Sequence, residues 1–124
     1  GGTECVLFVE DEPAVRRLGR RILERAGYRV VEASDGEGAL AALRGRDEPI
    51  HAVVTDVVMP RLAGGELARR LRETDPGLPV LFVSGHPDDP SRHIDLPEAE
   101  LLSKPYTADA LLGRLRALLD GPRD

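Results

Sequence analysis

The sequence lacks most features that tie a protein to a membrane or to the outside of the cell. Of its 124 residues only Cys5 is a cysteine, so an intramolecular disulfide is excluded. The position of Cys5 inside an apolar segment predicts a small, buried hydrophobic side chain. No apolar run approaches the roughly 18 residues of a membrane span, and no secretory signal segment is present. We therefore expect a soluble, cytoplasmic domain that does not contact a membrane.

Motifs that bind nucleic acids or nucleotides are also missing. The formal net charge is −5 and there is no helix-turn-helix or ribonucleoprotein motif, which argues against a nucleic-acid partner. Gly36 and Gly38 do not complete G-x-G-x-x-G, and no phosphate-binding loop occurs. The three histidines, His51, His86 and His93, show no metal-ligand spacing, which disfavours a transition-metal centre.

The composition that remains is that of one globular domain. With 41% hydrophobic and 31% charged residues, a disordered chain is not expected. A domain of this size buries roughly two-thirds of its unfolded surface without metals or disulfides. No internal repeat or low-complexity tract occurs. We expect a single domain over residues 1–124, with Gly1 and Gly2 as a candidate cloning remnant on a piece of a longer protein.

Four apolar segments, each too short for a helix, end in a polar side chain. The central one is rich in β-branched residues, runs from Ala52 to Asp56 and is stopped by Pro60. Buried parallel strands have this pattern. The other three segments, with the side chains at their ends, are Cys5–Val9 with Glu10 and Asp11, Val80–Val83 with Ser84, and Leu101–Ser103 with Lys104. In a parallel sheet these ends meet at the carboxyl edge, where open α/β sheets bind ligands.

Helical segments alternate with these strands and with a further strand at Tyr28–Ala33. The predicted helices follow Glu12-Pro13, a capping box of Ser34 and Glu37, the pair Gly64-Gly65, and the cap Thr107. The alternation implies a parallel sheet with helices on both faces. Right-handed crossovers favour the strand order 2-1-3-4-5, the doubly wound, flavodoxin-like α/β fold.

The first predicted helix has an apolar and a basic side. Four apolar residues recur at helical spacing and predict its buried stripe: Ala14, Leu18, Ile22 and Ala26. Five arginines occupy the remaining face: Arg16, Arg17, Arg20, Arg21 and Arg25. This basic face is either a solvated surface or a docking surface for an acidic partner.

The segment between Gly85 and Glu98 interrupts the alternation. Pro87, Pro90 and Pro97 leave room only for a short helix around residues 91–94. Each internal proline costs a helix roughly 3 kcal/mol. We therefore expect the fourth helix to be short or irregular and this segment to be the loosest part of the fold.

The predicted carboxyl edge gathers three carboxylates, a hydroxyl and an ammonium group. Clustered carboxylates repel one another unless a cation neutralises them, and Mg²⁺ needs only one or two carboxylates plus water. With a metal bound, Asp56 is a candidate nucleophile toward a phosphoryl donor. Lys104, the only lysine among 17 basic residues, would offset charge on the transferring group. Ser84 would hydrogen-bond the oxygens of that group.

The ordered set of these residues resembles the receiver domain of a two-component response regulator. The residues that carry the resemblance are Glu10-Asp11, Asp56–Pro60 with Gly64, Ser84-Gly85, and Lys104-Pro105-Tyr106. The resemblance covers nearly the whole chain. It implies that Asp56 accepts a phosphoryl group from a histidine kinase or a histidine phosphotransfer domain, and that the domain then switches conformation. It also implies no enzymatic activity beyond the domain's own phosphorylation and dephosphorylation.

The same resemblance implies a role for each residue of the cluster. Asp11, Asp56 and the backbone carbonyl of Val58 would bind Mg²⁺ directly, and Glu10 would act through water. Ser84 and Lys104 would contact the phosphoryl group. The peptide bond that follows the lysine would be cis, which is rare enough to test the resemblance.

The chain departs from similar domains at one position. They usually carry a switch aromatic three residues before the lysine, where this sequence has Leu101. This departure, together with the strand end Phe82–His86, resembles receivers attached to hybrid histidine kinases. Such an attachment would place a kinase in the same full-length protein.

Two other functions compete with this interpretation. A Mg²⁺-dependent aspartyl-phosphate phosphohydrolase also uses a strand-end aspartate, but such enzymes resemble D-x-D, and here the second acid is replaced by Val58. A pseudo-receiver would keep the fold as a protein-binding module without phosphorylation. The complete set of acids, hydroxyl and lysine argues against the pseudo-receiver.

Overall fold

The computed structural model of the protein describes residues 2–44, 46, 48–57, 62–85 and 100–121. Five strands form one parallel sheet in the order β2-β1-β3-β4-β5. The strands are β1 Cys5–Val9, β2 Arg29–Ala33, β3 Ala52–Asp56, β4 Val80–Ser84 and β5 Leu101–Ser103. The predicted doubly wound, flavodoxin-like sheet is confirmed, and each strand lies where the sequence predicts it.

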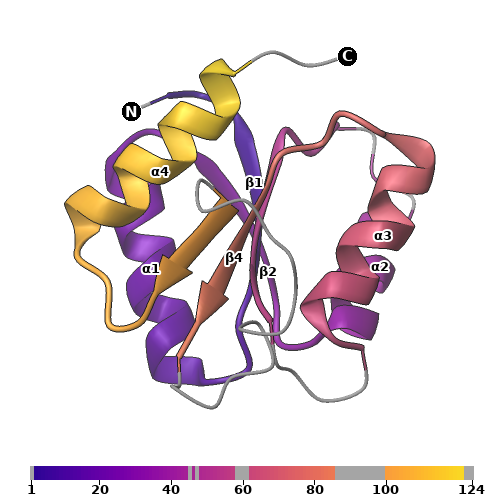
Figure 1. Ribbon diagram of the computed structural model, residues 1–124, viewed down its shortest axis with the longest axis horizontal. Coiled ribbons are helices and arrows are strands. Elements are labelled where there is room, and N and C mark those ends of the chain that lie inside the picture. The colour runs from indigo at the N-terminus through magenta and orange to yellow at the C-terminus, as the bar shows by residue number, and fades with distance from the viewer. Residues whose placement is uncertain (1, 45, 47, 58–61, 86–99, 122–124) are drawn as a thin grey trace.

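Helices cover both faces of this sheet (Figure 1). Helices α1 (Pro13–Arg25) and α4 (Ala108–Asp120) lie on one face, and α2 (Gly36–Leu43) and α3 (Gly64–Thr74) lie on the other. Within the described ranges, no helix combines the length and the apolar character needed to cross a membrane. The irregular helix expected between Gly85 and Glu98, and the expected looseness of that segment, lie outside the described residues.

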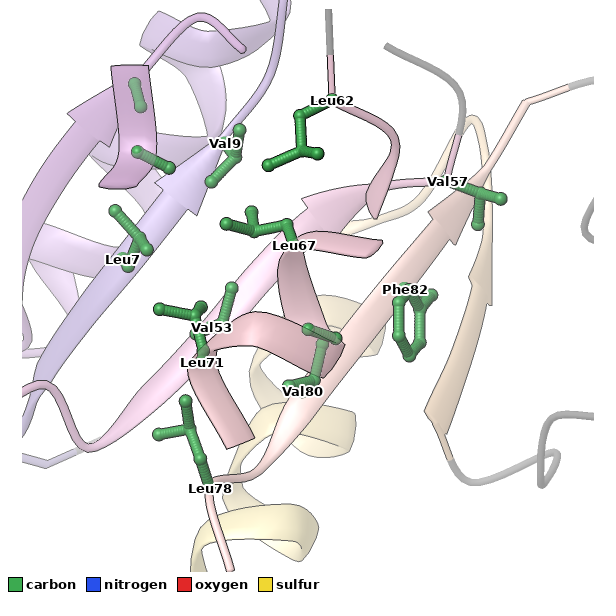
Figure 2. Close-up of a cluster of buried hydrophobic side chains, with 13 residues drawn as sticks. Leu7, Val9, Val53, Val57, Leu62, Leu67, Leu71, Leu78, Val80 and Phe82 are labelled. Atoms are coloured by element: carbon green, nitrogen blue, oxygen red, sulfur yellow. The ribbon is translucent and has the colours of Figure 1, made fainter. Parts of the chain in front are cut away.

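Side chains of alternate strand residues fill two separate layers of core. In β1, Leu7 and Val9 point toward α2 and α3, and Val6 and Phe8 point toward α1 and α4. Figure 2 shows the first layer, where strand residues meet Leu67 of α3. Because both faces of β1, β3 and β4 are covered, these strands consist mostly of buried apolar side chains, whereas the edge strand β2 is only partly buried. Fully burying one such side chain stabilises the fold by roughly 1.5–3 kcal/mol.

Helix α1 turns a different side toward the core than its periodicity predicts. The predicted stripe consisted of Ala14, Leu18, Ile22 and Ala26. Ala14 is instead exposed, and Leu18 is 56% exposed, whereas Gly19 and Leu23 are buried. A Cβ atom on Gly19 would lie 2.2 Å from Cζ of Phe8, so the aromatic ring fills the space that the glycine leaves. The first half of the predicted stripe is therefore wrong, and only its second half packs against the core.

Two helix ends differ in how well the sequence predicts them. Helix α2 is capped by Asp35 and not by the predicted Ser34, because Oδ1 of Asp35 accepts a hydrogen bond from the Gly38 N–H at 2.6 Å. The predicted cap Thr107 is confirmed, since its hydroxyl accepts from the Ala110 N–H at 3.0 Å. Each cap satisfies an N–H group that the first turn of a helix leaves without a partner.

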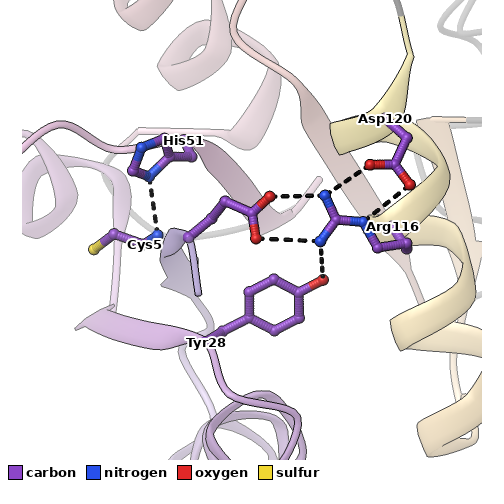
Figure 3. A network of polar contacts seen from close by, with 6 residues as sticks. Cys5, Tyr28, His51, Arg116 and Asp120 are labelled. Carbon is purple, nitrogen blue, oxygen red and sulfur yellow. Dashed lines mark hydrogen bonds and ion pairs between the residues drawn. The ribbon is translucent and has the colours of Figure 1, made fainter. Parts of the chain in front are cut away.

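One arginine of α4 joins the two ends of the chain at the amino edge of the sheet (Figure 3). The guanidinium of Arg116 donates to both carboxylate oxygens of Glu4, at 3.1 and 2.7 Å. It also donates to the hydroxyl of Tyr28 at 3.3 Å and to Asp120 at 3.1 and 2.8 Å. The hydrogen bond from Arg116 lowers the pKa of Glu4 to about 2. Helix α4 is thereby fixed at the edge opposite the predicted carboxylate cluster.

Candidate functional site

Three acidic side chains meet at the carboxyl ends of β1 and β3. Glu10, Asp11 and Asp56 each offer a carboxylate oxygen, and these atoms all lie within 4.8 Å of one another. The two strands are neighbours, with Val9 paired to Thr55, so the residues that follow them reach the same edge. Glu10 is 2% exposed and Asp56 is 5% exposed, whereas Asp11 is open to solvent. The structure thus gathers the carboxylates as the sequence predicts.

Lys104 lies between the two buried carboxylates. Its Nζ atom is 2.7 Å from Oε1 of Glu10 and 2.9 Å from Oδ1 of Asp56. The backbone N–H of Lys104 donates to the carbonyl of Ser84 at 2.8 Å, which fixes the lysine beside the end of β4. The peptide bond between Lys104 and Pro105 is cis, as the resemblance implies. One ammonium group therefore offsets much of the repulsion between two carboxylates.

The pKa values of the two buried acids are shifted in opposite directions. The pKa of Asp56 is raised to about 7: burial is the largest cause, the neighbouring Glu10 adds to it, and Lys104 opposes both effects. Burial also raises the pKa of Glu10, but hydrogen bonds with Asp56, with Lys104 and with the Glu12 N–H outweigh it, so that this pKa is lowered. Asp56 is therefore the buried acid whose charge changes near neutral pH.

The other two ionisable groups of the site are shifted by the same neighbours. Burial and the adjacent Glu10 raise the pKa of Asp11. Burial lowers the pKa of Lys104, but its hydrogen bonds with Glu10 and Asp56 outweigh this effect and raise the pKa. Lys104 stays a cation throughout the physiological range of pH. The cluster thus offers three oxygen-donor side chains beside one fixed positive charge.

The other residues that the sequence analysis singled out lie at different places relative to the cluster. Ser84 ends β4, is partly exposed and pairs with Ser103 of β5. Val58, whose carbonyl is a predicted metal ligand, lies outside the described residues. Leu101 packs toward α2 and α3, whereas Tyr106 packs on the opposite face. Burial and the negative charge of Glu10 raise the pKa of Tyr106 to about 12.

Sequence reasoning missed one residue that contacts the site. Nη1 of Arg16 donates to the backbone carbonyl of Glu10 at 2.8 Å. Helical periodicity placed Arg16 with the other arginines on the basic face of α1. The sequence places Arg16 in the first turns of the helix that follows the acidic pair Glu10-Asp11. Arg17 has nearly the same position, so the sequence alone does not show which of the two arginines contacts the site.

Known proteins resemble this chain in sequence over nearly its whole length. The sequence model of the response regulator receiver domain family matches residues 6–116. The response regulator receiver protein CpdR of Brucella abortus (strain 2308) is 36% identical over 121 residues, which cover 92% of this chain and 95% of CpdR. The sensor kinase CckA of the same organism is 38% identical over 121 residues, which cover 96% of this chain and 13% of CckA. The chain also spans 50% of the length of the response regulator MprA of Mycobacterium leprae (strain TN).

A solved structure shows the same fold and the same kind of domain. The receiver domain of the hybrid histidine kinase CckA superposes with a TM-score of 0.75 and 33% sequence identity, covering 94% of this chain and 99% of that domain. The family match spans most of the chain, the strand order agrees, and the acidic cluster faces a lysine at the expected edge. This chain therefore belongs to the response regulator receiver domain family of two-component signalling.

Proposed function

We propose that residues 1–124 form a single phospho-accepting receiver domain, and that Asp56 is the residue that accepts the phosphoryl group. The observation that carries the proposal is the contact between Asp56 and Lys104 at 2.9 Å inside the acidic cluster. Asp56 ends the central strand and is buried except at this edge. A carboxylate beside a fixed cation is suited to attack phosphorus, because the cation offsets charge on the transferring group.

The donor set of the cluster fits Mg²⁺. Carboxylate oxygens are the ligands that this hard ion prefers, and it needs only one or two of them besides water. We infer that Asp11 and Asp56 bind the ion directly, together with the carbonyl of Val58, and that Glu10 acts through water. When bound, Mg²⁺ would neutralise negative charge on the phosphoryl oxygens.

The side chains of this protein would divide the work of phosphoryl transfer. Asp56 first gives its proton to solvent, and its carboxylate oxygen then attacks the phosphorus of a phosphohistidine. The P–N bond breaks, and the histidine leaves with the electron pair and takes up a proton from solvent. Lys104 then exchanges its contact with Asp56 for one with a phosphoryl oxygen, and the hydroxyl of Ser84 donates to another. The domain thus catalyses only its own phosphorylation and dephosphorylation, and it signals by changing conformation.

The proposed partner is a histidine kinase or a histidine phosphotransfer domain. Support comes from the similarity to CckA, a sensor kinase of which this chain matches a small part. We also propose that a kinase is covalently attached to this domain in the full-length protein. We propose a cytoplasmic location and no contact with nucleic acid through this domain.

The test is incubation with acetyl phosphate in the presence and absence of Mg²⁺, followed by intact mass measurement. We expect the mass of one phosphoryl group to be added only when Mg²⁺ is present, and chelation with EDTA to prevent it. Labelling that does not depend on Mg²⁺ would contradict the proposed metal site. No labelling by acetyl phosphate or by a phosphorylated histidine phosphotransfer domain would favour the phosphorylation-independent binding module instead.

A further inference from the structure

We propose that Arg16 is a positioning residue for the carboxylate cluster, and that it holds the short connection between β1 and α1 in the geometry that its acids require. The inference rests on the proposed function of the site and adds a residue to it. Arg16 contacts the backbone carbonyl of Glu10 and the side chain of Glu32, so it acts on the site through the backbone of Glu10.

The backbone of Glu10 is held from both sides. Its N–H donates to the carbonyl of Ala33 at 3.0 Å, which continues the pairing of β1 with β2. Its carbonyl accepts from Nη1 of Arg16 at 2.8 Å. Its side chain then reaches Lys104 at 2.7 Å and the N–H of Glu12 at 3.0 Å. The guanidinium of Arg16 therefore holds the carbonyl between Glu10 and Asp11.

A second contact fixes the guanidinium itself. Nε of Arg16 lies 3.9 Å from Oε1 of Glu32 in β2, and the side chain of Arg16 is only 22% exposed. Arg16 thus reaches from α1 to two places: the connection between β1 and α1, at Glu10, and strand β2, at Glu32. A planar guanidinium presents its donors in a rigid fork, whereas an ammonium group is a compact charge at the end of a flexible stem.

The neighbouring arginines provide natural controls because they lack this geometry. Arg17 is exposed, and within the described ranges it makes no ion pair. Arg20 shares Glu32 with Arg16, at 2.7 Å, but its other ion-pair partner is Glu24. Methionine in place of any of the three keeps an unbranched stem and removes one positive charge. The three variants therefore separate the effect of charge, the effect of losing a partner of Glu32, and the effect of releasing Glu10.

The sign of the effect on Mg²⁺ binding distinguishes positioning from electrostatics. Removing a positive charge near an acidic site favours the binding of a divalent cation, because it removes a repulsion. Releasing the backbone that carries two of the acids weakens binding. Residues that hold metal ligands through hydrogen bonds typically change metal affinity by about 10–100-fold when they are replaced. We expect Arg16→Met to weaken Mg²⁺ binding about tenfold, at the lower end of that range.

The experiment has one arm without metal and one with it. In Mg²⁺-free protein, amide exchange measured by NMR should show that the Glu12 N–H loses protection in Arg16→Met and keeps it in Arg17→Met and Arg20→Met. Calorimetric titration with MgCl₂ should then show the loss of affinity in Arg16→Met alone. Arg16→Lys keeps the charge without the guanidinium and should lose less affinity; it also serves as the test variant should Arg16→Met fail to fold.

The outcomes separate this inference from the proposed function. A wild-type protein that binds no Mg²⁺ overturns both. If wild type binds Mg²⁺ and the Arg16 variants bind it equally well or more tightly, the site stands and the positioning role is wrong. Unchanged protection of the Glu12 amide in these variants would overturn the positioning role as well.

Discussion

The Nζ atom of Lys104 lies 2.9 Å from Oδ1 of Asp56, although Asp56 is the last residue of β3 and Lys104 follows β5. Strands β3 and β5 flank β4 in a parallel sheet, so both end at the same edge. In the absence of a metal the ammonium group is the counter-charge of two buried carboxylates. A divalent cation would take over this role and release Lys104 for a phosphoryl oxygen.

The raised pKa of Asp56 predicts how stability depends on pH in Mg²⁺-free buffer. This pKa is raised from 3.8 to about 7 in the folded protein, mainly by burial. The stability that protonated Asp56 contributes is therefore complete below the unfolded pKa and is lost as the pH rises through 7. Between about pH 6 and pH 8 the free energy of unfolding should fall by roughly 1 kcal/mol for this reason. Urea unfolding in EDTA at several pH values measures it.

Asp56→Asn is the control for that pH dependence. The amide keeps the shape of the side chain and does not titrate, so the free energy of unfolding should change less with pH than in wild type. Contributions from the rest of the protein are common to both and cancel in the difference. At the upper end of the range the variant should be the more stable protein. Parallel curves for the two proteins would show that Asp56 ionises normally.

Mg²⁺ should stabilise the folded protein, because the unfolded chain has no assembled cluster. At a free Mg²⁺ concentration ten times the dissociation constant, the gain is about 1.4 kcal/mol. Asp11→Asn should reduce the rise in melting temperature. Glu73→Gln, a matched change at an exposed acid of α3, should leave the rise as in wild type. A wild-type melting temperature that stays constant across millimolar Mg²⁺ would contradict the metal site.

Gly19→Ala should destabilise the fold, because the new Cβ atom would lie 2.2 Å from Cζ of Phe8. Overpacking of this kind costs roughly 1–3 kcal/mol. Gly113→Ala in α4 is the matched control, since its Cβ would meet no heavy atom within 4 Å. Alanine there should be neutral or stabilise the helix by up to about 1 kcal/mol. Thermal unfolding compares the two, and equal effects would refute the close packing of Phe8 on Gly19.

Glu4 and Arg116 should be energetically coupled. Each of the two residues loses its main partner when the other is replaced. Glu4→Gln and Arg116→Gln should therefore both lower the free energy of unfolding, and the double variant should lose less than the sum of the two single effects. Glu100→Gln combined with Arg116→Gln provides a pair without a direct contact and should be additive. Additivity in the first pair would mean that the bidentate contact does not contribute to stability.

The strands and the acidic cluster were predictable because both depend on local patterns. A buried parallel strand is a continuous apolar run, and its end is marked by the first polar residue, such as Glu10 or Asp56. Once the sheet is parallel, its topology alone brings these ends together. The start of α4 follows from equally local chemistry, because the predicted cap Thr107 accepts a hydrogen bond from the first turn of that helix.

The features that sequence reasoning missed depend on contacts between distant residues. Periodicity alone does not choose between Leu18 and Gly19 as the buried position of α1, because the shape of Phe8 decides it. Two side-chain contacts likewise depend on how the helices pack on the sheet: the hydrogen bond from Arg16 to Glu10 and the ion pair of Arg116 with Glu4. Predicting the difference between the pKa values of Glu10 and Asp56 also requires knowing how deeply each acid is buried and how far it lies from its neighbours.

The most direct test of the central claim is to locate the phosphoryl group on the chain. Protein treated with acetyl phosphate and Mg²⁺ is reduced with borohydride, which converts an aspartyl phosphate to homoserine, and is then mapped by tandem mass spectrometry. We predict homoserine at position 56 in wild type and no reduced residue in Asp56→Asn. Reduction at Asp11, or labelling of Asp56→Asn to the wild-type extent, would contradict Asp56 as the phosphoryl acceptor.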